Sequence, residues 1–254
     1  MVKSSVNFDV AYTMDSGQTP TFTWRKNGNE YTELSTNHTL TVSLREVEHP
    51  AEMQGKLRKM FKLQDDVPRI YEKISEDDEV LREAIAKYGG LRLTHCDEWE
   101  STVAFILSQN NHIKRIQKNY FDIHTTCGAI TPENLLKTDI SNLKLGYREK
   151  YLKGTAAMIV ENGFDLTRIN KFRLDDAREA LQELPGVGPK VADCILLYGY
   201  GRTECFPTDT WIYQAMEKYY DVRPKDVQQF AREKWGANAG YAQQLLFCKA
   251  RSEL

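Results

Sequence analysis

The feature that most constrains this chain is a short stretch, Leu-Pro-Gly-Val-Gly-Pro-Lys-Val-Ala at residues 184–192, which places two glycines between apolar segments. Gly186 and Gly188 can adopt the positive φ angles that a tight turn requires. Pro189 is favoured in the first turn of a helix, and the apolar residues after it continue with helical spacing. The stretch therefore predicts two helices joined by a glycine hairpin.

A hairpin of this kind is a candidate anion site, because backbone amides at a helix N-terminus point toward a negatively charged ligand. On a DNA-binding surface that ligand would be a backbone phosphate, bound by the amides of Gly186, Gly188 and Val191. The alternative is a turn between two helices without any ligand, which the two glycines alone would favour.

A lysine and an aspartate after the hairpin are the candidates for chemistry. Lys190 lies in the first turn of the second helix, where burial and the positive helix end lower the pKa of an amine and favour its use as a nucleophile. Nineteen residues later, Asp209 is placed to cap the next helix, and its carboxylate could stabilise positive charge on a reacting sugar. Taken singly, a solvated lysine and an ordinary cap are the more common interpretations.

The stretch resembles the helix-hairpin-helix DNA glycosylases, whose mark is a glycine hairpin followed by an aspartate in a Pro-x-Asp context. Lys190 is typical of the bifunctional members, and Leu-Pro-Gly-Val-Gly-x-Lys-Val-Ala-Asp-Cys is similar to the 8-oxoguanine DNA glycosylases in particular. The resemblance runs from about residue 8 to residue 247. It implies an α+β fold, with an N-terminal antiparallel β-sheet domain followed by a mostly α-helical, two-lobed helix-hairpin-helix core and the active site between the lobes.

The same resemblance implies a pocket for the damaged base. Gly17 would read the base through its carbonyl, although about two extra residues before Phe22 depart from the family pattern. Cys194, one helical turn after Lys190, would line the pocket. Gln243 and Phe247, also one turn apart, would bind the base edge and stack on its face. From residue type alone, these four are a turn glycine, a core cysteine and one face of an amphipathic helix.

Four further residues are implied in DNA contacts outside the pocket. Asn110 and Arg115 match residues that hold the orphaned cytosine opposite the extruded lesion, and amides and guanidinium groups are suited to base edges. Tyr147 would fill the gap that the extruded base leaves, and Arg148 would be a second contact to the cytosine. The alternatives are a helix cap with solvated charges and a core tyrosine at a helix start.

Composition limits the other possibilities. The formal net charge is −2, but residues 111–153 contain eight Lys/Arg against four Asp/Glu, which is either a DNA-binding face or a solvated one. The five cysteines lack metal-binding spacing, which argues against the iron–sulfur cluster of the endonuclease III type. No run of residues is long and apolar enough for a membrane span, and the N-terminus lacks a signal-peptide core, so we expect an intracellular protein.

Short runs rich in β-branched and aromatic residues predict strands at 6–13, 21–26, 30–34 and 39–46, with Asn27-Gly28-Asn29 as a hairpin turn. Helical spacing follows at 50–61, 67–88, 98–111, 151–161, 174–184, 224–235 and 240–252. We expect three units: a sheet domain with flanking helices at 1–88, a helical lobe with the orphan-base contacts at 89–180, and the catalytic hairpin lobe at 181–254.

The resemblance implies a bifunctional DNA glycosylase and AP lyase that excises 8-oxoguanine opposite cytosine through a Lys190 Schiff base. It would act in base excision repair on double-stranded DNA, as a monomer. It would require no metal or organic cofactor, although hairpin carbonyls would hold a structural monovalent cation.

Three alternatives stay open. A glycosylase for alkylated purines or oxidised pyrimidines should lack the Asn110/Arg115 and Gln243/Phe247 pairs together. A non-catalytic hairpin module would need neither Lys190 nor Asp209. An unrelated helical interaction protein would show no salt-dependent DNA binding.

Overall fold

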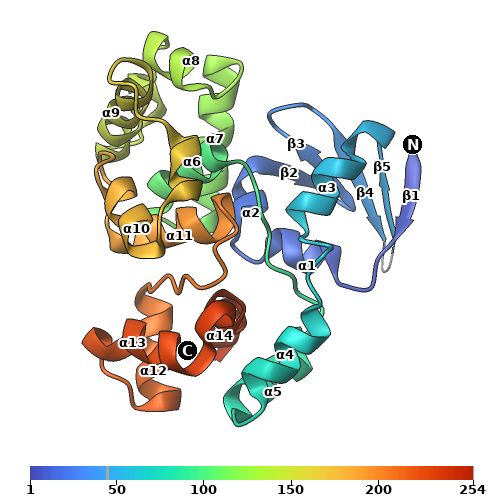
Figure 1. Cartoon of the computed structure of the whole chain (residues 1–254). Helices are drawn as coiled ribbons and strands as arrows, with labels where there is room; N and C mark the ends of the chain where they lie inside the picture. Colours follow the sequence, from blue (N-terminus) through green and yellow to red (C-terminus); the bar gives the residue numbers. More distant parts are fainter. Residues whose placement is uncertain (44–45, 254) are drawn as a thin grey trace.

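The computed structural model describes residues 1–43 and 46–253. Its N-terminal part is a five-stranded antiparallel sheet with the strand order β1-β5-β4-β3-β2 (Figure 1). The strands are β1 (Val2–Ser5), β2 (Trp24–Asn27), β3 (Glu30–Glu33), β4 (Thr39–Ser43) and β5 (Glu46–His49). The prediction of an N-terminal antiparallel sheet is confirmed, and so is the β2–β3 hairpin, in which Asn27 pairs with Glu30 and Gly28 has φ +59°.

Two of the expected strands are wrong in part or whole. Residues 6–13 contain no strand; the second half of them, 10–13, belongs to α1 (Val10–Asp15), because the Asp9 carboxylate accepts from the Tyr12 amide and starts a helix. Residues 21–26 begin in α2 (Thr19–Thr23), and become β2 only at Trp24. β-branched and aromatic residues favoured a strand in both places, but helix capping and packing favour the helices that form. In the expected strand 39–46, residues 44 and 45 lie outside the described residues.

The helical segments expected after the sheet are present, with one division. A short 3₁₀ turn, η1 (Ala51–Met53), leads into α3 (Gln54–Met60). The segment 67–88 is two helices, α4 (Val67–Ser75) and α5 (Glu79–Tyr88). They are separate because the Asp78 side chain accepts from the Leu81 amide and starts the second helix.

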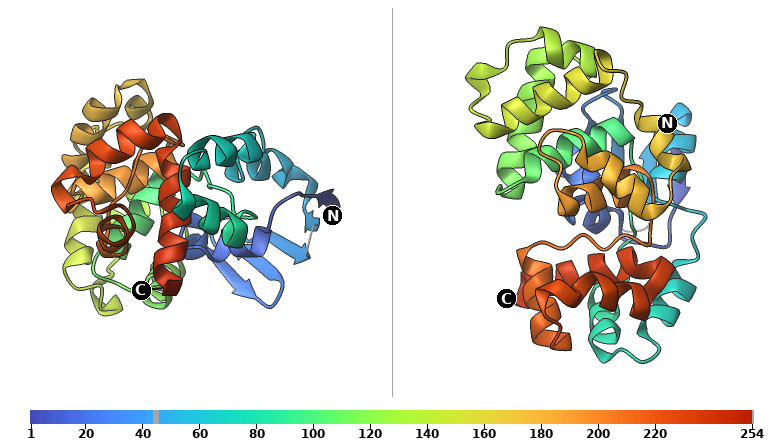
Figure 2. Two further views of the ribbon diagram at one scale, coloured as in Figure 1. Left: turned by 90° about the horizontal axis from the view of Figure 1, so that it is seen from below. Right: turned by 60° about the vertical axis from the view of Figure 1, so that its left-hand side comes forward.

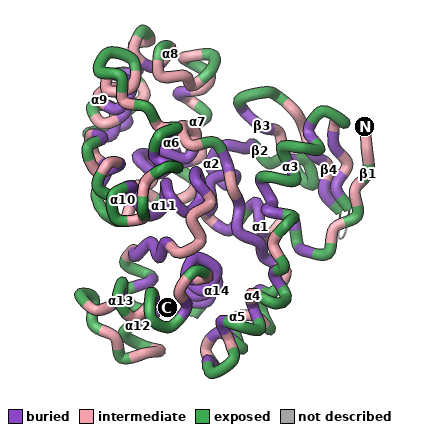
Figure 3. The backbone as a smooth tube through the Cα atoms, viewed as in Figure 1, coloured by how far each residue is buried: buried purple, intermediate pink, exposed green. Residues whose placement is uncertain are grey.

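The middle of the chain is helical. Its elements are α6 (Glu98–Ser108), α7 (Ile113–Cys127), α8 (Pro132–Lys137), η2 (Ser141–Leu143), α9 (Tyr147–Val160), η3 (Leu166–Lys171) and α10 (Leu174–Gln182). α6 packs against α11 (Pro189–Gly199), which is buried from Val191 to its end (Figure 3). A Cβ atom on Gly199 would lie 3.1 Å from the Ser101 Cβ, so the small residue permits this close packing.

The C-terminal part completes the core. It contains α12 (Thr210–Tyr220), η4 (Pro224–Asp226), α13 (Val227–Trp235), η5 (Gly236–Asn238) and α14 (Ala239–Glu253). α4 and α5 lie against this C-terminal group rather than against the sheet (Figures 1 and 2), and the Lys249 ammonium contacts the Glu83 carboxylate at 2.9 Å. α14 therefore joins the first and last parts of the chain. The boundaries near residues 88 and 180 stay predictions.

No helix in the stretches 1–43 and 46–253 has both the length and the apolar character that crossing a membrane would require.

Candidate active site

The glycine hairpin forms as predicted, but its two glycines have different roles. Gly186 has φ +79°, and a Cβ there would overlap the Tyr151 ring of α9, so only glycine fits. Gly188 has φ −90° and ψ 179°, which is extended backbone, and a Cβ there would meet nothing within 4 Å. The expectation that both glycines use positive φ angles is wrong for Gly188. Pro189 is the first residue of α11, as its type predicts.

The hairpin is held by α9. A Cβ on Gly154 would lie 2.9 Å from the Pro185 ring, so α9 approaches the hairpin as closely as its glycine allows. The Thr155 hydroxyl donates to the Pro185 carbonyl at 3.4 Å. This support fixes the start of α11 and the half-buried Lys190 on it. That the amides of Gly186, Gly188 and Val191 bind phosphate stays a prediction.

One small cavity gathers the predicted chemistry. It has a volume of about 50 Å³ and lies between α6, α11, α14 and the segments around residues 17 and 207. Its lining includes all six residues predicted for catalysis and the base pocket: Gly17, Lys190, Cys194, Asp209, Gln243 and Phe247. These residues come from distant parts of the sequence, so the fold brings together what the motifs suggested separately.

The candidate nucleophile and its carboxylate partner are both fixed in position. The Lys190 ammonium lies 5.8 Å from the centre of the Phe105 ring. Asp209 is the N-cap of α12, as predicted, and its carboxylate accepts from the Ile212 amide at 2.9 Å. That hydrogen bond orients one carboxylate oxygen and leaves the other to face a ligand.

Cys194 is a thiol in this cavity and not a thiolate. Burial raises its pKa to about 11, and the positive charge of the neighbouring Lys190 opposes the shift only in part. A neutral thiol behaves as a small apolar group, so the cysteine suits the wall of a pocket rather than nucleophilic attack.

Gln243 lines the cavity and has one unpaired acceptor. Its Nε2 donates to the Pro207 carbonyl at 3.1 Å, whereas its buried Oε1 has no hydrogen-bond partner among the described residues. A buried polar atom of this kind is costly unless a ligand supplies the missing donor. Beside it, Phe247 contacts Gly17: a Cβ there would lie 3.2 Å from the Phe247 ring, and Gly17 has φ +84°. Any other residue at position 17 would be strained.

A wider vestibule of about 650 Å³ opens at the mouth of the small cavity. Lys190, Asp209, Gly17 and Phe247 line both, so the candidate catalytic residues face a space large enough for a nucleotide. Trp211 lies at its edge and is 39% exposed.

The residues predicted to contact the orphaned base form a second cluster around the start of α9. The Asn110 side-chain amide donates to the Tyr147 hydroxyl at 3.1 Å, and that hydroxyl donates to the Gln109 carbonyl at 3.2 Å. Tyr147 is 45% exposed, as a residue that enters a duplex must be. α9 begins at Tyr147 rather than at residue 151 as expected. Arg115 is exposed and donates to the Lys144 carbonyl at 3.5 Å.

Arg148 is the exception in this cluster, because it is buried. Its guanidinium donates to the carbonyls of Gln109, Asn110 and Leu145, and its centre lies 4.7 Å from the Tyr147 ring centre. It therefore holds the backbone of the Asn110 loop in place. A direct contact with the cytosine stays a prediction and requires the guanidinium to leave these carbonyls.

Sequence reasoning missed four residues that line the small cavity: Phe105, Tyr198, Pro207 and Gln244. Tyr198 was detectable in principle, because it lies on the Lys190 face of α11, four residues after Cys194. His112 caps α7: its Nδ1 accepts from the Arg115 amide at 3.3 Å.

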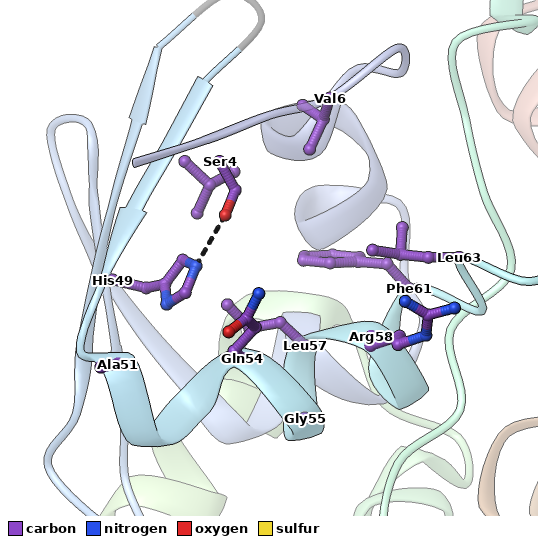
Figure 4. Close-up of a pocket in the computed structure, with 11 residues that line it drawn as sticks. Ser4, Val6, His49, Ala51, Gln54, Gly55, Leu57, Arg58, Phe61 and Leu63 are labelled. Atoms are coloured by element: carbon purple, nitrogen blue, oxygen red, sulfur yellow. Dashed lines mark hydrogen bonds between the residues drawn. The ribbon is translucent and has the colours of Figure 1, made fainter. Parts of the chain in front are cut away.

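Within residues 1–43 and 46–253, no three His, Cys, Asp or Glu side chains are grouped in a way that would hold a metal ion. A second cavity, of about 460 Å³, lies between β5 and α3 (Figure 4). None of the residues that line it belongs to the small cavity around Lys190. The central histidine of the second cavity, His49, is satisfied by the Ser4 hydroxyl and the Pro50 carbonyl. It adds nothing to the active site.

Comparisons with known proteins agree with this geometry. The family model of the 8-oxoguanine DNA glycosylase N-terminal domain matches residues 1–102, and the model of the HhH-GPD superfamily base excision DNA repair protein matches residues 103–237. A probable N-glycosylase/DNA lyase of Methanothermobacter thermautotrophicus is 30% identical over 296 residues, covering 96% of this chain and 94% of the relative.

Solved structures are similar over almost the whole chain. MBOgg1 in complex with a low affinity DNA ligand has a TM-score of 0.87 at 30% identity, over 99% of this chain and 94% of that one. The Clostridium acetobutylicum 8-oxoguanine glycosylase/lyase, in complex with dsDNA containing cytosine opposite to 8-oxoG, has a TM-score of 0.86 at 29% identity, over 97% and 93%. The matching models follow one another in the order that the sequence predicts, and the chain belongs to the 8-oxoguanine DNA glycosylase family, helix-hairpin-helix DNA glycosylase/AP lyases of base excision repair.

Proposed function

We propose that this enzyme excises 8-oxoguanine opposite cytosine from duplex DNA and then cuts the strand through a Lys190 Schiff base. The observation that carries the proposal is Gln243, which lines the same cavity as Lys190 and whose buried Oε1 has no donor among the described residues. The Watson–Crick edge of guanine offers N–H donors that match this acceptor. The Gly17 carbonyl would accept from N7–H, which 8-oxoguanine has and guanine lacks. Cys194 and Phe247 would enclose the base.

The chemistry needs only the chain's own residues. The neutral Lys190 amine attacks the sugar C1′ while the bond from C1′ to the base breaks, and the base leaves with that electron pair and takes up a proton. The Asp209 carboxylate stabilises the positive charge that develops on the sugar. Opening of the sugar ring gives the Schiff base. Loss of a C2′ proton then expels the 3′ phosphate by β-elimination, and water releases Lys190.

Opposite-base selection is proposed for the cluster around Tyr147. Cytosine presents acceptors at N3 and O2, which suit the exposed Arg115 guanidinium and, once freed, that of Arg148. Its amino group suits the side-chain oxygen of Asn110. Tyr147 would occupy the gap left by the extruded base, which offsets part of the unstacking cost of a few kcal/mol.

DNA binding completes the proposal. The hairpin amides would bind a phosphate, a monovalent cation would sit on hairpin carbonyls, and the enzyme would act as a monomer without a required cofactor, in the compartment that holds the DNA. The dsDNA complex of the Clostridium relative supports the choice of substrate.

The test is trapping with borohydride, which reduces a Schiff base to a stable covalent link. With an 8-oxoguanine:cytosine duplex, we expect an adduct for the wild type and none for Lys190→Gln. The exposed Lys225 supplies a matched control, since Lys225→Gln makes the same change away from the cavity and should trap normally. An undamaged duplex should give no adduct with any of the three. A wild type that does not trap on 8-oxoguanine would contradict the proposal and direct attention to alkylated or oxidised-pyrimidine substrates.

A further inference from the structure

Gln243 and Gln244 are neighbours on α14 that both line the small cavity, but their amides are used differently. Gln243 leaves its Oε1 open, as described above. The Gln244 Oε1 accepts from the Tyr198 hydroxyl at 2.5 Å, and its Nε2 donates to the Ser16 carbonyl at 3.0 Å. Both groups of Gln244 are therefore bonded to the protein, and its exposure is only 2%.

The Ser16 carbonyl, which accepts from Gln244, belongs to the peptide bond that precedes Gly17. A peptide is planar, so the Ser16 carbonyl and the Gly17 amide move as one unit. Gln244 holds the carbonyl side of this unit. On the other side, the Gly17 amide donates to the Thr21 hydroxyl at 2.9 Å, which in turn donates to the Met14 carbonyl at 2.6 Å.

The residue after Gly17 is fixed as well. The Gln18 side-chain Nε2 donates to the Arg92 carbonyl at 2.8 Å, and its side-chain Oε1 accepts from the Thr94 backbone amide at 2.8 Å. With the Ser16–Gly17 peptide and the Gln18 side chain both hydrogen-bonded, Gly17 is kept at φ +84° against the Phe247 ring. Among these supports, Gln244 is the one that comes from α14, the helix of Gln243 and Phe247.

We propose that Gln244, oriented by Tyr198, is a positioning residue for base recognition: through the Ser16 carbonyl it sets the Gly17 backbone in register with Gln243 and Phe247. This inference rests on the proposed function of Gly17. It assigns no contact with DNA to Gln244, because both of its polar groups are occupied. Tyr198 stacks on Phe105 with ring centres 5.4 Å apart, and Phe105 lies beside Lys190, so the network ends next to the nucleophile.

The experiment compares two activities of the same enzyme. Excision of 8-oxoguanine needs base recognition, whereas cleavage of a duplex that already contains an abasic site needs only Lys190 and Asp209. For Gln244→Met, which keeps the side-chain length but removes the donor, we expect single-turnover excision to fall by about tenfold. Cleavage at the abasic site should stay within about twofold of wild type.

Two further variants make the result interpretable. Tyr198→Phe removes only the hydroxyl that orients Gln244 and should reduce excision selectively, to a smaller extent. Gln182→Met is the matched control, because Gln182 makes one comparable bond, to the Arg178 carbonyl at 3.1 Å, on α10 outside the cavity. It should leave both activities unchanged.

Each outcome has a distinct meaning. Equal loss of both activities in Gln244→Met, or no loss of either, overturns the positioning role while the wild-type activity still supports the proposed function. A wild type that cleaves abasic DNA but never excises 8-oxoguanine overturns the proposed function, and this inference with it.

Discussion

Glu100 and His95 are two side chains whose burial shifts their pKa values in opposite directions. Burial raises the pKa of the Glu100 carboxyl from its ordinary 4.5 to about 7. Burial, helped by the nearby Lys59 and Lys62, lowers the pKa of His95 from 6.5 to about 4. Both residues therefore favour the neutral form in the folded chain.

The two shifts make opposite contributions to stability. Between pH 4.5 and 7 the folded chain keeps the Glu100 proton that the unfolded chain loses, so stability falls as pH rises through this window. Between pH 4 and 6.5 the unfolded chain binds a proton that folded His95 does not, so stability falls as pH drops.

We expect the stability of Glu100→Gln relative to wild type to rise on going from pH 4.5 to 8, by about 1–3 kcal/mol. The stability of His95→Asn relative to wild type should rise in the opposite direction, from pH 7 to 4. Thermal melts across this range measure both; parallel curves for all three proteins would refute the assignment.

Single residues also show what a sequence can reveal. The positions of Lys190 and Asp209, in the first turn of one helix and at the cap of another, were predictable because those signals are local. Gln244 was not, because its partner Ser16 is 228 residues away and the contact exists only once α14 lies against the N-terminal segment. The buried state of Arg148 was hidden for the same reason, since its acceptors on the Asn110 loop are set by packing.

Among the structural elements, the glycine hairpin offers two positions, 186 and 188, at which the same substitution should have different effects. Gly186→Ala places a side chain at φ +79° and against the Tyr151 ring, so we expect at least about 2 kcal/mol of destabilisation, with weaker DNA binding. Gly188→Ala adds a methyl group into open space at an ordinary φ and should change stability by no more than about 0.5 kcal/mol. Chemical denaturation compares them. Equal destabilisation by the two variants would contradict the geometry of the hairpin.

Elements were predicted well where periodicity and caps agreed. α6 starts at residue 98, as its helical spacing predicted, and there the Asp97 carboxylate accepts from the amides of Trp99 and Glu100. The first part of the chain was harder, because α1 and α2 are one to two turns long and rich in threonine and valine, residues that composition assigns to strands. Their helical state depends on a single cap at Asp9 and on burial against the core. Such short helices have too few residues to show a helical period.

For the whole molecule, the contact between α5 and α14 determines how the chain unfolds. Leu81, Ala84 and Tyr88 of α5 are buried, and the Tyr88 hydroxyl lies 2.6 Å from that of Ser252. A fragment of residues 1–88 would expose this apolar face. We expect the full chain to unfold in one cooperative urea transition and the fragment to show none. A fragment that melts cooperatively, alongside two transitions in the full chain, would instead support a boundary at residue 88.

The residues of the small cavity are synthesised in a fixed order, because they come from distant parts of the chain. Gly17 is synthesised first, then Phe105, Lys190 and Asp209, and finally Gln243 and Phe247 on α14. Domains generally fold as units during synthesis. Lys190 and Asp209 can therefore leave the ribosome before Gln243 and Phe247 complete the wall of the cavity. α14 emerges after both residues, and its packing on α5 and its hydrogen bond to the Ser16 carbonyl form in the same step as the cavity wall. Under the proposed function, Lys190 therefore gains its full surroundings only together with the residues proposed to restrict its target.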